Sequence, residues 1–223
     1  SYLSIVDIPS TTPSTSTHKS FRGSTGDDVL LVVSDTSSFT HGKINIYRIP
    51  YHAFDAAVVK NETTLDMDSS YHIIEKKPSS GQGNGIAFGR RISTIKYGNY
   101  VVIAVSAPMW NDGNKNKGNA GFIRIYVYDL YSDTLVVPDG VTLKHPNPND
   151  DLRLGEKSLA MTVFNNGSND YIVLVAGGKG NDDDKGKVVA FRSNAIVAGQ
   201  APVFTNPTSE NSCLLYTSDA ADD

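Results

Sequence analysis

Residues Ala87 to Tyr128 carry the pattern that decides the fold: AFGRRISTIKYGNYVVIAVSAPMWNDGNKNKGNAGFIRIYVY. Three β-like runs follow one another with turn residues between them. Arg91–Ile95 alternates in polarity, Tyr100–Ser106 is almost continuously apolar, and Phe122–Tyr128 is rich in β-branched and aromatic residues. Pro108 should end the middle run, because proline cannot donate to a β-ladder. Such a sheet cannot cover both of its faces alone, so the pattern predicts neighbouring sheets stacked on it.

The same plan recurs on both sides of this stretch. Phe88-Gly89 matches Leu154-Gly155, 66 residues further on, and the two later runs match as well. Upstream, Asp28–Asp35 and Gly42–Arg48 repeat the last two runs only. A period somewhat above 60 residues that carries four short strands is typical of β-propeller blades.

These repeats resemble the FG-GAP repeat of the integrin-alpha-type β-propeller. Phe88-Gly89 stands for the FG pair, Ser106-Ala107-Pro108 for GAP, and Gly118 to Tyr126 for the closing glycine and strand. The resemblance covers most of residues 21–205 and is best in the middle repeat. It implies an all-β chain that forms a partial β-propeller of about three four-stranded antiparallel blades. The positions expected to have a structural role in the repeat are Phe88, Gly89, Ala107, Pro108, Gly121, Leu154, Gly155 and Gly186.

We expect the chain to be a fragment of a larger propeller, so the rest of that propeller is one expected partner. The apolar alternation of Ser1–Ile8 suggests the outer strand of a preceding blade, followed by a Ser/Thr/Pro-rich loop. Residues 213–223 resemble the translation of a transposase-type sequencing adapter and are excluded from the fold. The expected segments are an edge strand and loop at 1–20, blades within 21–212 at about 21–80, 81–147 and 148–212, and the tail at 213–223.

The composition excludes several classes of function. Residues 213–223 hold the single Cys and three of the 24 acidic residues, so 21 acidic residues remain against 20 Lys and Arg. This balance offers no basic excess for nucleic-acid binding. No apolar run reaches the ~18 residues of a membrane helix, so we expect no membrane insertion within this fragment. Without Cys, disulfides say nothing about the compartment.

Three loops between second and third strands, at 35–42, 108–121 and 178–186, should emerge on one face. The integrin-like resemblance implies that protein or glycan ligands dock there. Trp110 suits such contacts if its ring is exposed, and the alternative is a ring folded back over the blade edge. The candidate ligand-binding residues are Trp110, Asn111, Asp112, Phe39, His41, Asp182 and Asp183.

Calcium is the one cofactor that the resemblance suggests. The family often carries a loop of the form D-x-[DN]-x-D-G-x-x-D, whose oxygens wrap the cation. Here Asn166, Gly167 and Asp170 fit this pattern and Phe164 does not. Asp184 ends an acidic run and is a further candidate ligand. The alternatives are a polar hairpin turn at Asn166-Gly167 and a solvated loop at the acidic run.

Enzyme signatures are weak. The five His residues show no metal-ligand spacing, and no G-x-S-x-G nucleophile elbow occurs. We therefore expect an extracellular or cell-surface binding and adhesion scaffold that contacts ligands through loops on one face. The alternative is the propeller domain of a secreted enzyme, such as a phospholipase or a glycan-degrading enzyme, whose catalytic residues lie outside this fragment. A purely structural role is a third interpretation.

Overall fold

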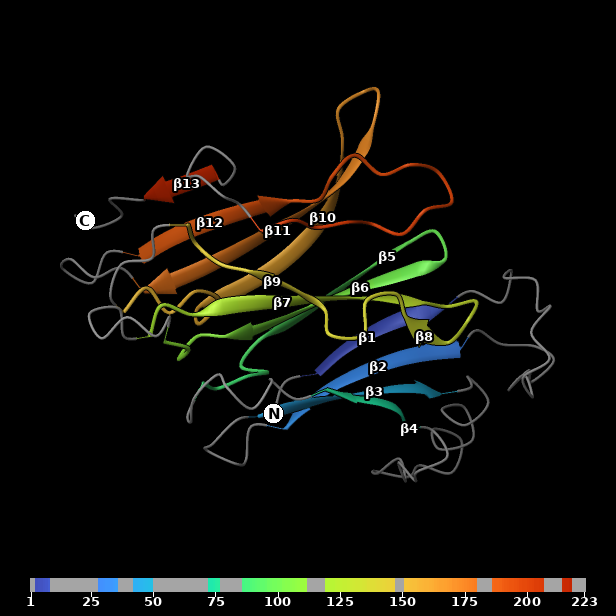
Figure 1. The fold of residues 1–223 in the computed structure, drawn as a ribbon, viewed down its shortest axis with the longest axis horizontal. Coiled ribbons are helices and arrows are strands. Elements are labelled where there is room, and N and C mark those ends of the chain that lie inside the picture. The colour runs from blue at the N-terminus through green and yellow to red at the C-terminus, as the bar shows by residue number, and fades with distance from the viewer. Residues whose placement is uncertain are drawn as a thin grey trace, which may run out of the picture.

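Every regular element in the described part of the chain is a β-strand, and that part contains no helix. The structure is a computed structural model, and it describes residues 3–8, 28–35, 42–49, 72–76, 86–111, 119–146, 151–179, 186–206 and 214–217. The strands form three separate antiparallel sheets (Figure 1). The predicted all-β class is therefore confirmed for these residues.

The first sheet has four strands in the order of the sequence: β1 (Leu3–Ile8), β2 (Asp28–Asp35), β3 (Lys43–Ile49) and β4 (His72–Lys76). This corrects the expectation that the first residues belong to a preceding blade, because β1 pairs along its whole length with β2. The pairing was hidden because the segment between β1 and β2 carries no hydrophobic periodicity that would join them.

The second sheet is built on the stretch that opened the sequence analysis. Its path runs β5 (Ile92–Tyr97), β6 (Tyr100–Ala107), β7 (Phe122–Asp129) and β8 (Thr134–Leu135), and β9 (Val141–Leu143) also pairs with β7. Strand β6 ends one residue before the proline, where the sequence predicts its end. The outer edge of this sheet is thus shared by two short strands on either side of a turn.

The third sheet repeats the order of the first. It contains β10 (Ser158–Asn165), β11 (Asp170–Lys179), β12 (Gly186–Arg192) and β13 (Leu214–Thr217). Strand β13 lies within the segment that the sequence analysis excluded from the fold, and its backbone pairs with β12. The described fold therefore extends into residues 213–223.

The second sheet lies between the other two and is buried on both faces. Val101 and Ile103 of β6 pack in a core with the first sheet, whereas Val102 and Ala104 pack in a second core with the third sheet. Alternate residues of a strand point to opposite faces, so a strand covered on both sides must be apolar throughout. This explains the continuous apolar run of β6.

Consecutive sheets also meet at their first strands. Strand β5 contacts both β1 and β10. The hydroxyl groups of Ser4 on β1 and Thr94 on β5 lie 2.6 Å apart and share a hydrogen bond. Consecutive sheets therefore contact each other along the edge that is formed by their first strands.

A close backbone approach joins the first sheet to the second. Gly42, just before β3, lies against the backbone of Phe88, and a Cβ at this glycine would collide with the Phe88 carbonyl oxygen. Beside it, a Cβ on Gly89 would lie 2.8 Å from the Cβ of Ser34. Only residues without a side chain permit this packing at both positions.

The same junction recurs between the second and third sheets. Gly121, just before β7, lies against Leu154, and a Cβ there would be 2.5 Å from the Leu154 nitrogen. A Cβ on Gly155 would lie 2.6 Å from the Cβ of Ser106. The residue before each apolar–glycine pair also adopts a positive φ, 54° at Ala87 and 46° at Arg153. Two junctions with matching geometry show that the sequence repeat is a structural repeat.

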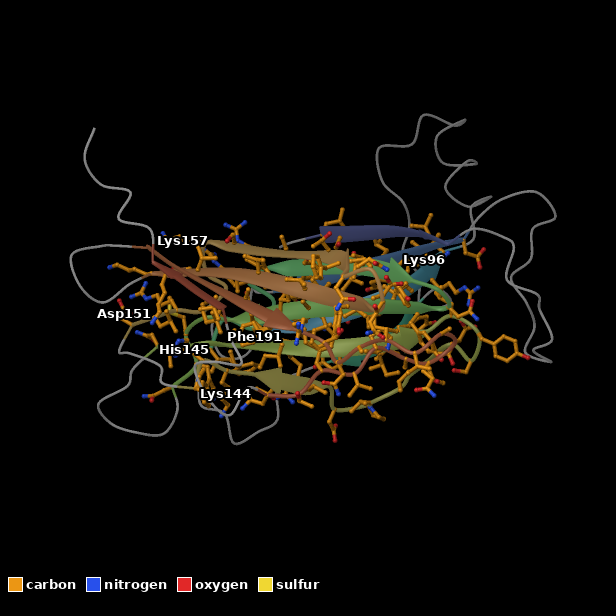
Figure 2. All side chains as sticks on the ribbon, turned by 90° about the horizontal axis from the view of Figure 1, so that it is seen from above. Lys96, Lys144, His145, Asp151, Lys157 and Phe191 are labelled. Carbon is orange, nitrogen blue, oxygen red and sulfur yellow. The ribbon has the colours of Figure 1, made fainter. Side chains whose placement is uncertain are left out.

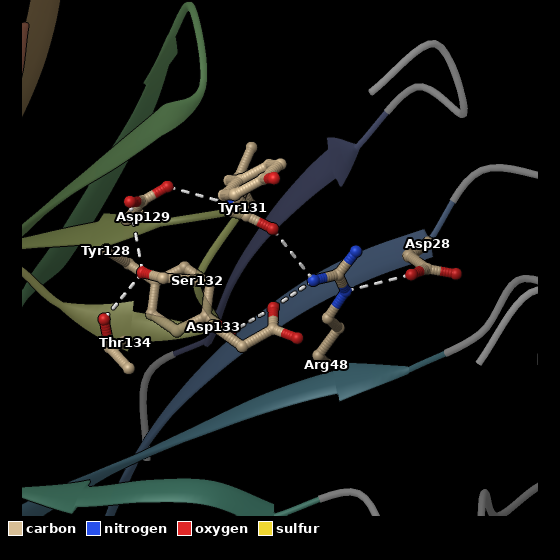
Figure 3. Close-up of polar contacts among 9 residues, drawn as sticks. Asp28, Arg48, Tyr128, Asp129, Tyr131, Ser132, Asp133 and Thr134 are labelled. Atoms are coloured by element: carbon tan, nitrogen blue, oxygen red, sulfur yellow. Dashed lines mark hydrogen bonds and ion pairs between the residues drawn. The ribbon is translucent and has the colours of Figure 1, made fainter. Parts of the chain in front are cut away.

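Arg48 on β3 ties the first sheet to the turn after β7 (Figure 3). Its Nε donates to Asp28 at 2.9 Å, and its guanidinium also donates to the Asp133 carboxylate and to the Leu130 carbonyl oxygen. Desolvation is the largest single influence on Arg48 and lowers its pKa, but Asp133 and Asp28 together outweigh it, so the pKa is raised. Burial raises the pKa of Tyr128, whose hydroxyl donates to Asp133 at 3.1 Å.

Replacing Gly121 by Ala should destabilise the protein by about 2–5 kcal/mol, because the left-handed conformation and the overpacking against Leu154 both cost free energy. Gly98→Ala is the matched control. It has a φ of 56° but no atom within 4 Å of the added Cβ, so only the conformational cost of about 1–2 kcal/mol remains. Urea unfolding measures both. Equal losses for the two variants would contradict the role given to the junction.

Replacing Arg48 by Met should cost about 1–2 kcal/mol, between the values for exposed and buried ion pairs, because Asp28 and Asp133 lose their shared partner. In a double-mutant cycle with Asp133→Asn, the double variant should lose less unfolding free energy than the sum of the two single losses, because both substitutions remove the same ion pair. Strictly additive effects would show that the pair does not hold the two sheets together.

Candidate functional site

The end of the sheets where β2, β6 and β11 finish is called the loop-bearing end. The two glycine junctions lie here, so the described strand ends that the second-to-third-strand loops connect lie close to one another. Figure 2 shows Asp151, His145 and Lys144 toward this end, away from Lys96. Several predicted ligand-binding or metal residues belong to loop parts outside the described residues: Phe39, His41, Asp112, Asp182, Asp183 and Asp184.

Trp110, the only Trp of the chain, is buried at this end rather than presented to solvent. Its side chain is 7 % exposed, and its ring meets Phe122 edge-on with centroids 5.5 Å apart. The Lys144 ammonium group covers the ring at 4.0 Å from its centroid. Of the two arrangements that the sequence allows, the ring takes the folded-back one. The neighbouring Asn111 is exposed.

Charged and polar side chains form a cluster at the base of the loops. This junction cluster consists of Asn119, Asp151, Arg153, Glu156 and Lys179. One Asp151 oxygen accepts from Arg153 Nε at 2.6 Å and from Asn119 Nδ2 at 3.2 Å. The Lys179 ammonium lies 4.0 Å from the other Asp151 oxygen, and the Arg153 guanidinium lies 3.7 Å from Glu156. The cluster thus joins the loop of the second sheet to the third sheet.

The electrostatics of the junction cluster favour the ionised forms of Asp151 and Arg153. Desolvation is the largest single influence on Asp151 and raises its pKa. Hydrogen bonds from Arg153 and Asn119 and the charges of Arg153 and Lys179 together outweigh desolvation, so the pKa of Asp151 is lowered. The hydrogen bond to Asp151 in turn raises the pKa of Arg153. One oxygen of Glu156 is buried without a hydrogen-bond partner among the described residues. The paired charges, including the ion pair between the partly exposed Lys179 and Asp151, connect the second and third sheets at this end.

Backbone conformation is also unusual in the junction cluster. Asn119, Asp151 and Arg153 have positive φ values of 56°, 58° and 46°. Asn and Asp tolerate this region well, whereas Arg adopts it rarely. The backbone amide of Arg153 donates to the Asn119 carbonyl at 2.8 Å, which holds both residues in this conformation.

Sequence reasoning missed the junction cluster. Asp150 and Asp151 are adjacent in the sequence, but adjacent carboxylates alone do not indicate an ion-pair network. The partners of Asp151 come from positions 119, 153 and 179, and only the stacking of the second and third sheets brings them together. The one local signal was the Asp-x-Arg spacing.

Asn166 and Asp170, the predicted calcium ligands, lie at the hairpin between β10 and β11, at the other end of the sheet. The Asn166 side-chain oxygen accepts from the backbone amides of Ser168 and Asn169 at 3.1 and 2.9 Å. One Asp170 oxygen accepts from Tyr97 at 2.7 Å. This hydrogen bond, and then one from Asn165, lowers the pKa of Asp170.

The hairpin itself is shorter than the calcium pattern requires. Thr162 and Phe164, which would be loop positions in that pattern, belong to strand β10. The described residues contain no group of three His, Cys, Asp or Glu side chains that could hold a metal ion. The geometry of the described hairpin is therefore that of a polar turn, and calcium binding there stays a prediction.

Comparison with known proteins adds no relative: no family model, curated protein or solved structure matches this chain significantly. Within the described ranges, no helix has the length and apolarity to cross a membrane.

The ionised state of Asp151 predicts a pH dependence. A carboxyl with a lowered pKa in the folded state stabilises the protein above its ordinary pKa of 3.8, and that contribution is lost as the pH falls through the folded value. Wild type should therefore be more stable than Asp151→Asn near pH 6, by up to about 1 kcal/mol for this solvent-screened group. The difference should shrink below about pH 4.

Urea unfolding between pH 3 and pH 7 measures this difference. Asp139→Asn is the control, because Asp139 lies between β8 and β9 and outside the junction cluster. A difference between wild type and Asp151→Asn that stays constant over the whole pH range would show that the charge of Asp151 is not what stabilises the cluster.

Proposed function

We propose that this chain is part of an integrin-alpha-like β-propeller that acts as an extracellular or cell-surface binding scaffold. The loop-bearing end is its binding surface, and the ligand is a protein or a glycan. The sheets are the scaffold, and the loops between second and third strands make the contacts.

The structural repeat supports the propeller. Each sheet runs through its first four strands in sequence order, and each apolar–glycine pair sits in the same way on the sheet before it. Consecutive sheets approach at β1, β5 and β10, as expected when first strands face a common axis. The expected blades correspond to the three sheets, with β1 added to the first and β13 to the last.

One observation carries the binding proposal: the described strand ends that the three second-to-third-strand loops connect all lie at the same end of the stack. Functional residues gather on loops that a rigid scaffold holds in place. The buried Trp110 and the junction cluster provide that rigid base, because Trp110 is packed and the cluster is ion-paired at the loop-bearing end. Loop residues such as Asp112 and Asp183 are then free to determine which ligand binds.

A glycan array and a panel of immobilised extracellular-matrix proteins test the proposal directly. For any ligand found, Asp112→Ala and Asp183→Ala should weaken binding by at least about tenfold if they are contact hot spots. Asn99→Ala is the matched control, since Asn99 is exposed in the turn at the opposite end and should leave the affinity within about twofold.

Trp110 is not a suitable probe in this assay, because its substitution would empty part of a core and confuse binding with folding. Binding that is insensitive to both aspartate variants but lost in Asn99→Ala would place the ligand at the wrong end and refute the proposed surface. Turnover of a glycan or phospholipid by the chain itself would refute a role in binding alone.

A further inference from the structure

The third sheet has an apolar face that points away from the other two sheets. Tyr171, Val173 and Val175 of β11 lie on this outer face, beside Val188 and Ala190 of β12. The opposite face carries Ile172, Leu174 and Phe191 and is packed against the second sheet. The three β11 side chains and Val188 are only half-buried. Phe164, which pairs with Tyr171 across the strands, is 49 % exposed.

The equivalent positions on the other two sheets are covered. In the first sheet, Leu30, Val32, Ile44 and Ile46 occupy these positions and are fully buried against the second sheet. In the second sheet the corresponding residues are fully or almost fully buried against the third sheet: Val102, Ala104, Ile123 and Ile125. The third sheet therefore exposes a face whose equivalent residues are buried on the first and second sheets.

The two positions that form a junction on the other sheets also exist on the third sheet, at Gly186 and Gly177. Gly186 is exposed, whereas Gly177 is buried beside Ser158 of β10. Gly186, the first residue of β12, corresponds in the repeat to Gly42 and Gly121, which directly precede β3 and β7. A Cβ on either of the latter two would strike the backbone of the next sheet, whereas a Cβ on Gly186 would meet no described residue within 4 Å. Gly177 corresponds in the same way to Ser34 and Ser106, which receive the glycine of the next sheet.

We propose that this outer face docks a fourth four-stranded sheet, whose first strand follows a large apolar residue and a glycine. The apolar residue would lie against Gly186 and its glycine against Gly177, as Leu154 and Gly155 lie against the second sheet. This inference rests on the repeat architecture of the proposed function and names the partner surface and the motif that it accepts.

The chemistry of the face favours such a sheet over a polar ligand or a second copy of this chain. Its centre carries valines and no charge. Two described cations lie toward its ends: Arg192 is stacked at 4.7 Å on the Tyr171 ring, and Lys179, which pairs with Gly186 across the strands, lies 4.0 Å from an Asp151 carboxylate oxygen. A second copy would have to offer a free apolar–glycine pair. Both pairs in the repeat, Phe88-Gly89 and Leu154-Gly155, are already seated on neighbouring sheets.

The test extends the full chain by repeating residues 77–146, which carry the Phe88-Gly89 pair, after Asp223. A cysteine placed by Val175→Cys, with the single native cysteine removed by Cys213→Ser, reports on the face. Thiol labelling of this cysteine should be at least about tenfold slower in the extended chain than in the unextended one, because the docked sheet excludes the reagent.

Gly186→Val supplies the matched variant. It should restore fast labelling in the extended chain, because its side chain would fill the space that the apolar–glycine pair needs. In the unextended chain the same substitution should leave the thermal midpoint unchanged, since no residue in the described part of the chain lies within 4 Å of the added Cβ.

A second extension that repeats residues 147–206 carries the Leu154-Gly155 pair and guards against a folding failure of one extension. Fast labelling in both extended chains would overturn the proposal. Slow labelling in the unextended chain that depends on its concentration would also overturn it, in favour of a second copy. No ligand is present in this assay, so its outcome is independent of the loop-binding test.

Discussion

The close contact between a glycine and the backbone of the next sheet is the constraint on which the structure depends. At Gly42 and at Gly121, the chain approaches the following apolar–glycine pair so closely that any side chain would collide with main-chain atoms. The contact fixes where one sheet sits on the next, and so it fixes which strands share an edge. The contact occurs twice, with Phe88 and with Leu154 at equivalent positions of the repeat. One type of contact therefore fixes how all three described sheets stack.

This rule has consequences for the core and for the polar surface. Because the second sheet lies between two neighbours, both faces of β6 and β7 are shielded from solvent. Their Val, Ile and aromatic side chains form part of two separate cores. Charged groups are left at the ends of the strands. There Arg48 and the junction cluster bridge from one sheet to the next, so the ends are tied by ion pairs where the centre is tied by apolar packing.

The hydrophobic pattern predicted the strands well wherever neighbours in sequence are neighbours in the sheet. The β5–β6 turn and the β10–β11 hairpin follow from Gly98-Asn99 and Asn166-Gly167. The pattern did worse where pairing skips a long segment. The pattern places β1 in another unit, because the segment between β1 and β2 holds no local signal of pairing. Strand β13 lies in the residues that were excluded for their resemblance to an adapter translation, although it pairs with β12.

By itself, the sequence determined the all-β class, the repeat and the glycines that mark it, because alternation and turn chemistry are local properties of a chain. Tertiary structure alone decided which polar groups meet and which side chains are covered. Trp110 is buried because Phe122 and Lys144 close over it. Asp151 is ionised among partners that lie up to 32 residues away along the chain. Such contacts depend on how separate sheets stack, and that stacking leaves no periodic trace in the residues that it brings together.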